Sequence, residues 1–423
     1  MKLTATIVTK LFISALFGLA VAGCNSNRTG SHNSDAYPDQ AKKVLIHYMG
    51  WYGDTVADSF HNDINRHWRY GTANTPLIGF YDSKDQSLLA YHVLLSWSCG
   101  IDGIIINVKD AYDAVCMRSL ISTIQWIRGI DSTNFSYAFC ISFDDQGFDL
   151  VFPYDTTFQK LSHLRDSILP VLPCYLRYND RPAIFVFDYP DKFMTAGDFK
   201  KVADEVFGSA PPVIIWNSLD DQENSHQYVG GFYPWVQPGN KGWDKTGCNW
   251  GKEYLQWYYP RVNAINTDYQ YVFTCGGVWP GFDDRKNTSW GGGRYMSRNE
   301  GTVYDSTWFF VLSYDKPLPL KWVVIETWND WNEGTEIEPG IENGYQYLLS
   351  TIRNSNSFKG TSVDNDTLKF EAARKIYEAF RCTENGKTDG DYSQTIKKAV
   401  REFLRQDFAG SLRTAGSIVE RGE

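Results

Sequence analysis

Two carboxylates in the most distinctive segment of the chain have the type and spacing to do acid–base chemistry. Asp330 and Glu333 lie within residues 326–338, ETWNDWNEGTEIE, which follow the apolar run 322–325. If this segment leaves a strand as a helical turn, residues three apart share one face. A proton donor and an anion beside flat aromatic side chains are what cleavage of a glycosidic bond requires. The alternative interpretation is an acidic turn whose side chains are solvated.

The elements that would position these acids form a regular series. Eight short runs, many of them continuously apolar, alternate with helix-like segments, and this predicts a (β/α)8 TIM barrel of parallel strands covered on both faces. The runs are 44–48, 103–108, 137–143, 183–187, 213–216, 229–233, 271–275 and 322–325. The sixth is the weakest because Gly230 and Gly231 interrupt it. Residues 86–99 have helical spacing, with Gly100 placed to end the helix.

The regions outside the barrel strands divide the chain further. We expect the barrel to occupy residues 41–355 and C-terminal helices to pack on it over 356–423, where 370–380 and 396–404 are amphipathic. Residues after Gly410 are expected to be loose. Between 228 and 310 the loops are long and rich in aromatic residues and glycine, including Gly276 and Gly277. Trp235, Trp279 and Trp290 adjoin turn residues and are expected to be exposed, although large aromatics also pack in the outer layer of a barrel.

Functional residues of a (β/α)8 barrel lie at the C-terminal ends of its strands, so position supplies a list of candidates. We expect substrate binding by His47, Tyr48, Trp51, Asn107, Asp144, Asn217, Trp235, Arg285, Trp290, Trp328, Asn329 and Trp331. Lys109 follows the second strand, and Asp188 and Tyr189 follow the fourth. His47 could instead be a hydrogen-bonded core residue. Asp144 could simply cap the next helix.

The first 23 residues have the pattern of a targeting segment. Lys2 and Lys10 precede the apolar stretch 11–21, which is too short to cross a bilayer. Small residues directly before Cys24 are typical of a bacterial lipoprotein signal, in which this cysteine is lipidated after cleavage. The alternative is a secretory peptide with an incidental cysteine. Residues 24–40 predict a flexible tether, so the lipid is the expected membrane contact of an outer-membrane or periplasmic lipoprotein of a Gram-negative bacterium.

Charge and cysteine usage argue against several partners and cofactors. The formal net charge of −9 becomes −11 once residues 1–23, with Lys2 and Lys10, are removed. This acidic balance disfavours nucleic acid, which is bound mainly through clustered lysine and arginine. No cysteine lies in a CxxC spacing and no EF-hand spacing occurs, so we expect no metal and no cofactor. Most of the seven cysteines after Cys24 lie in apolar runs and are expected to be buried.

The chain resembles the bacterial glycoside hydrolase family 71/99-like proteins, relatives of the family 99 endo-α-mannosidases and of the WbsX-like proteins. The resemblance covers most of residues 43–350. It rests on segments in the expected order, namely KVLIHYM at 43–49, HW at 67–68, LIGFYD at 77–82, GIDG at 100–103, PGF at 280–282 and, the most specific, WNDWNEGTEIEP at 328–339. The resemblance implies a (β/α)8 barrel and a retaining glycosidase.

The resemblance also implies roles for the two acids. In family 99 the matching segment carries two glutamates, of which the second, at the position of Glu333, is the general acid and base. The first is proposed to act as a base on the 2-hydroxyl of the sugar. This chain has Asp330 there, about one methylene shorter, so it could be a nucleophile, a base or a charge stabiliser. The second strand ends in Asn107-Val108, where related sequences often have Asp-Trp.

We therefore expect a monomeric glycoside hydrolase that acts on a polysaccharide or oligosaccharide. Glu333 needs a raised pKa to hold a proton, and Asp330 is expected to stay ionised, helped by Asn329 or a nearby tyrosine. The alternative is a catalytically inactive, glycan-binding surface lipoprotein. A glycosyltransferase ranks last, because no DxD motif in a nucleotide-sugar context is apparent.

Overall fold

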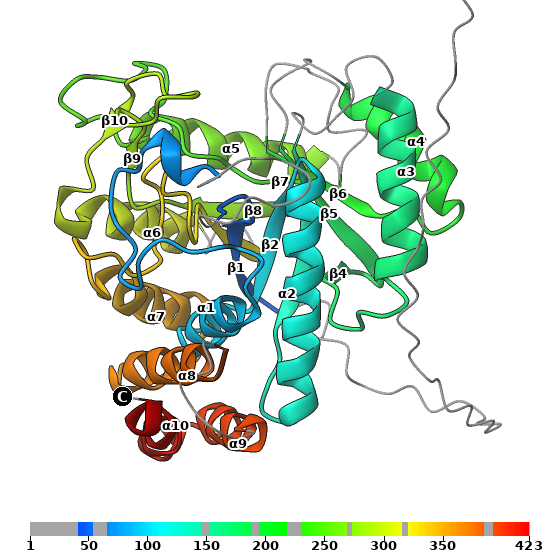
Figure 1. Cartoon of the computed structure of the whole chain (residues 1–423). Helices are drawn as coiled ribbons and strands as arrows, with labels where there is room; N and C mark the ends of the chain where they lie inside the picture. Colours follow the sequence, from blue (N-terminus) through cyan, green and yellow to red (C-terminus); the bar gives the residue numbers. More distant parts are fainter. Residues whose placement is uncertain are drawn as a thin grey trace, which may run out of the picture. The chain divides into compact units, whose positions relative to one another are not determined.

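The structure is a computed structural model and describes residues 41–53, 66–144, 153–187, 194–217, 230–268, 273–314, 320–384 and 392–422. The expected signal segment with Cys24 lies outside these residues, as do Asp188 and Tyr189. Eight parallel strands form the centre (Figure 1). They are β1 (Lys43–Met49), β2 (Gly103–Val108), β3 (Ala138–Asp144), β5 (Arg181–Phe187), β6 (Val213–Trp216), β7 (Gly231–Phe232), β8 (Phe273–Val278) and β11 (Trp322–Ile325).

The ring of strands closes on itself. β1 pairs with both β2 and β11, and β3 pairs directly with β5, so each of the eight has a parallel neighbour on either side. This confirms the predicted (β/α)8 barrel. β4 (Arg177–Tyr178) is a short antiparallel addition to β5, and β9 (Phe282–Asp283) pairs with β10 (Tyr295–Met296) outside the ring.

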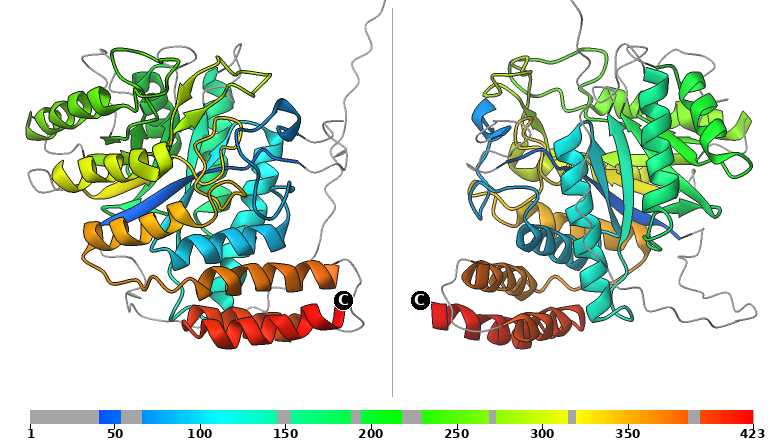
Figure 2. Two further views of the ribbon diagram at one scale, coloured as in Figure 1. Left: turned by 90° about the vertical axis from the view of Figure 1, so that its left-hand side faces the viewer. Right: turned by 45° about the vertical axis from the view of Figure 1, so that its right-hand side comes forward.

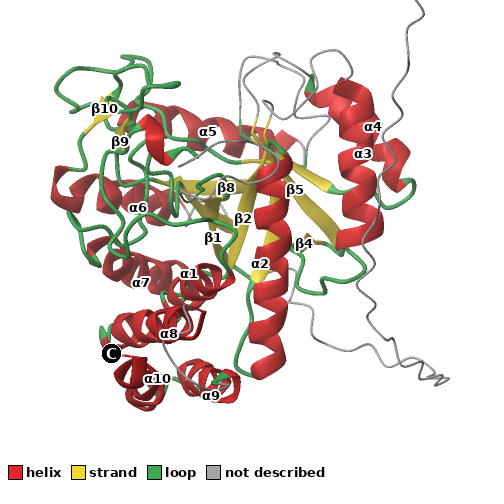
Figure 3. Ribbon diagram, in the orientation of Figure 1, coloured by secondary structure: helices red, strands yellow, loops and turns green. Residues whose placement is uncertain are grey.

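Helices surround the strands, and long loops gather around β9 and β10 (Figure 3). The helices of the barrel are α1 (Gln86–Ser98), α2 (Ala111–Ile130), α3 (Pro153–His163), α4 (Ala196–Phe207), α5 (Lys252–Asp268), α6 (Thr302–Tyr314) and α7 (Gln346–Lys359). Short turns of other helix types are η1 (Trp68–Tyr70), η3 (Leu164–Ile168) and η5 (Asn299–Gly301). Because the helices cover the strands' outer face, most strand residues are apolar, as their sequence indicated.

Local signals begin and end the helices where the sequence placed them. The Asp85 side chain accepts hydrogen bonds from the first backbone amides of α1, and Asp110 does the same for α2. Gly100 follows α1 with φ of 79°, a left-handed conformation that favours glycine. The cap formed by Asp110 fixes the position of the chain directly after the end of β2, which is part of the site.

Two expectations for the glycine-rich half of the barrel are wrong. Gly276 and Gly277 lie inside β8, where a Cβ on Gly277 would come within 2.2 Å of Pro234. The close approach of Pro234, which follows β7, therefore requires glycine at position 277. Trp279 is fully buried rather than exposed, and its indole Nε1 donates to the carbonyl of Trp250 over 3.0 Å.

The described C-terminal residues are helical from Phe408 to Gly422, so the expectation of loose residues after Gly410 is also wrong. The helices are α8 (Leu368–Glu384), α9 (Ser393–Leu404) and α10 (Phe408–Gly422). They lie together against α1 and α2 (Figure 2). Ala415 and Ile418 of α10 are buried in this layer, which explains why the last helix is ordered without any sequence motif.

Candidate active site

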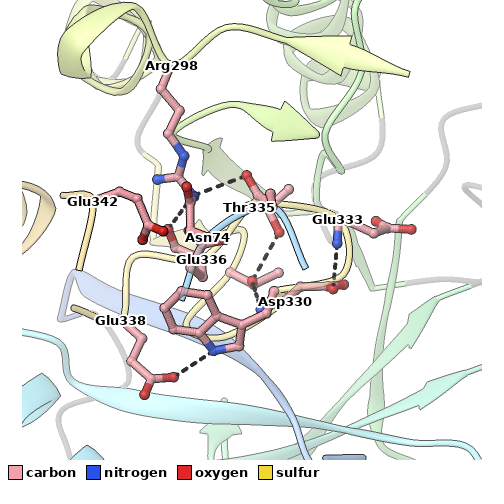
Figure 4. Close-up of polar contacts among 12 residues, drawn as sticks. Asn74, Arg298, Asp330, Glu333, Thr335, Glu336, Glu338 and Glu342 are labelled. Atoms are coloured by element: carbon pink, nitrogen blue, oxygen red, sulfur yellow. Dashed lines mark hydrogen bonds and ion pairs between the residues drawn. The ribbon is translucent and has the colours of Figure 1, made fainter. Parts of the chain in front are cut away.

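Asp330 and Glu333 lie in a tight turn that directly follows β11, at the C-terminal end of the barrel. The backbone amide of Glu333 donates to Oδ1 of Asp330 over 3.1 Å, so the aspartate caps this turn (Figure 4). The Asp330 amide in turn donates to Oγ1 of Thr327 over 2.8 Å. The Asp330 residue is 2 % exposed and the Glu333 side chain 15 %. A solvated acidic turn, the alternative raised by the sequence, is therefore excluded.

The surroundings raise the pKa of both carboxyl groups. For Asp330, burial and then the charge of Glu333 raise the pKa well above its ordinary value, while Lys109 opposes the rise. Burial also raises the pKa of Glu333, but Arg294 and a hydrogen bond from Trp290 lower it. Repulsion between two buried carboxyls favours a state in which one of them holds a proton. Because the donors surround Glu333, we assign this proton to Asp330, which reverses the expectation that Asp330 stays ionised.

Glu333 has two cationic or polar neighbours from the loop after β8. The indole Nε1 of Trp290 donates to Oε1 of Glu333 over 3.0 Å, and Nη2 of Arg294 lies 3.7 Å from the same oxygen. Asp284 holds Arg294 in place, since its Oδ2 accepts from Nε over 2.6 Å. These contacts give the Glu333 carboxylate a defined direction toward the less buried side of the turn.

Aromatic rings from two loops cover this side of the site. The imidazole of His67 stacks on Trp51, with 4.9 Å between ring centroids, and meets Trp290 edge-on at 5.3 Å. Tyr70 lies 5.8 Å from Trp290. Burial and the charge of Lys109 lower the pKa of His67 well below its ordinary value, so this imidazole is neutral at pH 7. Uncharged ring faces of this kind suit the apolar faces of sugars.

Trp331, a predicted sugar-binding residue, points away from Glu333. Its Nε1 donates to Oη of Tyr81 and to Oε2 of Glu338, both over 3.1 Å. Glu338 also accepts from Oη of Tyr81 over 2.7 Å and lies 3.0 Å from Nε2 of His92. Figure 4 shows Glu338 and Glu333 on opposite sides of the segment. The buried indole therefore anchors the turn and does not face the acid pair.

Three more predicted binding residues lie behind the turn. The amide side chain of Asn329 accepts from the backbone N of Met49 over 2.8 Å and donates to its carbonyl over 2.9 Å, which ties the segment to β1. Tyr48 lies on the outer face of β1, with Oη 3.1 Å from Nδ1 of His92. Trp328 is buried against the same imidazole at 5.5 Å. Alternate residues of a strand face opposite ways, so Tyr48 meets the helix layer instead of the barrel interior.

The barrel interior beside the turn holds a buried acid–histidine pair. Nδ1 of His47 lies 2.7 Å from Oε2 of Glu326. The imidazole also contacts the rings of Tyr233 at 5.3 Å and Trp235 at 5.4 Å. Burial raises the pKa of Glu326, and His47 opposes this rise. His47 is therefore paired inside the barrel, while the half-buried Trp235 extends from this pair toward the surface.

The ends of β2 and β3 meet in a second polar pair. Nδ2 of Asn107 donates to Oδ2 of Asp144 over 2.8 Å, and both residues are buried. The charge of Asp144 raises the pKa of Glu333, so this pair lies within electrostatic range of the acids. Asn217 follows β6, and its backbone N donates to the carbonyl of Val186 over 3.2 Å.

Arg285, which the sequence suggested as a ligand, lies on the rim. Its Nη2 pairs with Asp283 at 2.7 Å, and its guanidinium lies 3.7 Å from the ring centroid of Tyr295. The arginine that the fold brings to Glu333 is Arg294 instead. No sequence signal separates these two residues, because both belong to the same loop and the choice depends on how it folds back.

Two further residues of the site were not assigned from the sequence. The phenolic Oη of Tyr52 accepts from the backbone N of Trp331 over 2.9 Å and from that of Asn332 over 3.2 Å, so it supports the turn. Glu326 pairs with His47 inside the barrel. Its position at the end of a predicted strand was a usable signal, whereas the contact of Tyr52 with the turn depends on the tertiary fold.

Metal sites, membrane-spanning helices and cavities can also be assessed in the described part of the chain. No group of three or more His, Cys, Asp or Glu side chains there is arranged to hold a metal ion. None of the helices described is long and apolar enough to cross a membrane. A cavity of about 310 Å³ lies between the ends of β2 and β3 and the helices α2 and α3, and neither Asp330 nor Glu333 is among the described residues that line it.

The strands form a closed (β/α)8 barrel, and the acid pair lies at its C-terminal end. Two solved structures of the family 99 endo-α-mannosidase from Bacteroides thetaiotaomicron share this fold, with 18 % and 15 % identity and TM-scores of 0.57 and 0.58. Each match covers 77 % of this chain, and they cover 98 % and 99 % of the mannosidase. A glycoside hydrolase-like protein matches with 13 % identity and a TM-score of 0.52, over 78 % of this chain and 98 % of its own.

The sequence itself matches no family model and no curated protein. At these identities the likeness to solved structures shows the fold. The chain therefore has the fold of the family 99 glycoside hydrolases, as the resemblance in its sequence motifs predicted.

Proposed function

We propose that the protein is a glycoside hydrolase that cleaves glycosidic bonds in a polysaccharide or oligosaccharide. The observation that carries this proposal is the buried pair of Asp330 and Glu333 at the C-terminal end of the barrel. A carboxyl whose pKa is raised by burial and a second that carries a negative charge supply the donor and the anion of such a reaction. The ring faces of Trp51 and Trp290 beside the pair suit a sugar.

In this mechanism Glu333, the more exposed acid, meets the glycosidic oxygen. A sugar that packs against Glu333 excludes water and raises its pKa further, so the shared proton moves from Asp330 to Glu333. Glu333 then protonates the leaving oxygen. The ionised Asp330 acts either as a nucleophile or as a base on the 2-hydroxyl. Both routes retain the configuration at the anomeric carbon, and an inverted product observed by NMR during hydrolysis would contradict them.

The test of the general acid is Glu333→Gln, which keeps the size of the side chain and its hydrogen bond from Trp290. The release of reducing ends from a panel of bacterial and plant polysaccharides should fall by at least about 100-fold, with little change in glycan affinity. Glu342→Gln is the matched control, because Glu342 is exposed and accepts from the backbone N of Thr75 over 2.9 Å. Unchanged turnover in Glu333→Gln would rule out the assigned acid.

A glycan-binding protein without catalysis is the second candidate. Two observations favour it. Asp330 has a structural role because it caps the turn, and Asn107 stands at a strand end where related sequences often carry a carboxylate. In that case glycans would bind to the wild type, and no reducing ends would be released. The same panel therefore separates the two functions.

We also propose that the chain is a lipoprotein of the bacterial cell envelope, attached through Cys24. This rests on the basic and apolar pattern of residues 1–23 and on the small residues before the cysteine. Labelled palmitate should be incorporated into the wild type and not into Cys24→Ser. Equal labelling of both would refute lipidation at this position.

A further inference from the structure

Lys109 places a positive charge next to the acid pair. It follows β2, and its Nζ lies 4.6 Å from the ring centroid of Trp51 and 5.9 Å from that of Trp290. The indole of Trp290 donates directly to Glu333. One tryptophan ring therefore separates the lysine charge from the carboxylate proposed to protonate the leaving group.

Three other cations near this end of the barrel have acidic partners. Arg66 pairs with Asp110, Arg285 with Asp283, and Arg294 with Asp284. Throughout the described residues, by contrast, Nζ of Lys109 makes neither a hydrogen bond nor an ion pair, and its contacts are the two indole rings. The side chain is half-buried, so the ammonium has lost part of its hydration without gaining an anion.

We propose that Lys109 binds a negatively charged substituent, a carboxylate or a sulfate, on a sugar of the substrate. This inference rests on the proposed hydrolase function and adds the substrate class, an anionic glycan. An ammonium is a compact point charge, which suits either anion, whereas an arginine would favour a bidentate geometry. The tryptophan rings beside Lys109 would pack on the sugar that carries the charge, so ring stacking and ion pairing would act on the same residue of the glycan.

The arrangement of charges limits where this substituent lies. The negative charge of the acid pair, assigned to Glu333, repels an anion, so the charged group belongs on the Lys109 side of Trp290 and away from the cleavage point. The whole chain carries a net charge of −9, which gives no long-range attraction for a polyanion. Recognition is therefore local, within the roughly 8 Å over which charges act at physiological salt.

The lysine charge has a second effect, which the test must separate from binding. Lys109 opposes the rise in the pKa of Asp330 and lowers the pKa of His67. A purely electrostatic role would alter turnover of every substrate alike and change its pH profile. An anion-binding role alters KM or binding for charged ligands and leaves neutral ones unchanged.

The first experiment measures binding without hydrolysis, because Trp51 and Trp290 report on this position by fluorescence. The probes are glucuronate and glucose 6-sulfate, with glucose as the neutral control. Lys109→Met should weaken binding of the charged probes roughly 10- to 100-fold, and Lys109→Arg should restore most of it. Lys286→Met is the matched control, since Lys286 lies on the same rim and its Nζ donates to the carbonyl of Ala73 over 3.1 Å. Equal binding of glucose and both anions, or charged binding that survives Lys109→Met, would overturn the proposal.

The second experiment uses hydrolysis of paired polysaccharides. Each uronate- or sulfate-bearing polymer of the panel is compared with the same polymer after carboxyl reduction or desulfation, which also tells carboxylate from sulfate. The charged member should be cleaved with the higher kcat/KM, and Lys109→Met should remove this preference through KM. Hydrolysis confined to neutral glycans would refute the anionic substrate and leave the hydrolase standing. Binding of the charged probes without any hydrolysis would support recognition of an anionic glycan and contradict the hydrolase function.

Discussion

The indole of Trp290 and the carboxylate of Glu333 are joined by a hydrogen bond of 3.0 Å across the mouth of the barrel. A donor of this kind favours the ionised carboxylate, so it lowers the pKa of Glu333 against the effect of burial, which raises it. The bond comes from a loop that is more than 30 residues away in the sequence. It links the strength of the proposed acid to the position of one tryptophan.

Trp290→Phe tests this link, because it keeps an aromatic ring and removes the donor. The pKa of Glu333 should rise, and the basic limb of the pH–rate profile for hydrolysis should move up by roughly one pH unit. Trp257→Phe, on the exposed surface of α5, is the control and should leave the profile unchanged. A basic limb that stays in place in Trp290→Phe would show that the hydrogen bond does not tune this acid.

Asp330→Asn separates the chemical role of Asp330 from its role as a cap. Asparagine caps a turn about as well as aspartate, so the temperature of thermal unfolding should change little. Hydrolysis should fall at least about 100-fold, because the amide can neither attack the sugar nor take up a proton. Asp330→Ala should lose stability as well as activity. Full activity in Asp330→Asn would leave Asp330 as a structural residue.

Glu336 is expected to make stability depend on pH. It pairs with Arg298 and accepts from Asn74 over 2.7 Å (Figure 4), and burial raises its pKa from 4.5 to about 7. Folding thus strengthens proton binding, so this group stabilises the protein at low pH and loses that contribution as pH rises from about 4.5 to 7.

Glu336→Gln should remove this dependence. The free energy of unfolding is measured in urea at pH 5 and at pH 8. Its decrease between these two pH values should be smaller in the variant than in the wild type, by roughly 2 to 3 kcal/mol. The exposed Glu342→Gln should behave as the wild type does. An identical fall in wild type and Glu336→Gln would contradict the raised pKa.

His47 and Glu326 should be energetically coupled, since they form a buried pair at 2.7 Å. Either single change, His47→Phe or Glu326→Leu, leaves a polar partner buried without its counterpart and should cost roughly 3 to 5 kcal/mol. The double variant should be destabilised by at least about 1 kcal/mol less than the sum of the singles. Additive losses in urea unfolding would show that the pair is not coupled.

The sequence by itself determined the repeating pattern of the fold and the position of the acids. Six of the eight predicted strands overlap ring strands by four residues or more, because continuous apolar runs are the local signature of strands buried on both faces. The other two, 229–233 and 271–275, overlap β7 and β8 by two and three residues. The glycines inside β8 were not predicted to lie in a strand, and the reason is a tertiary contact. Gly277 admits Pro234 against β8, a contact that no property of the local sequence reveals. Asp330 and Glu333 were found because their spacing is local.

Only the tertiary structure decided which side chains meet those acids. Tyr48 and His47 are adjacent in the sequence, yet strand geometry sends one to the helix layer and the other into the barrel. Trp331 and Glu333 are two residues apart, and the turn directs the first toward Glu338 and the second toward Trp290. Arg294 and Trp290 come from the loop after β8, whereas Lys109 follows β2, and their contacts depend on backbone paths that span many residues. Side-chain direction and long-range approach are set by packing of the whole barrel, so they could not be predicted from spacing.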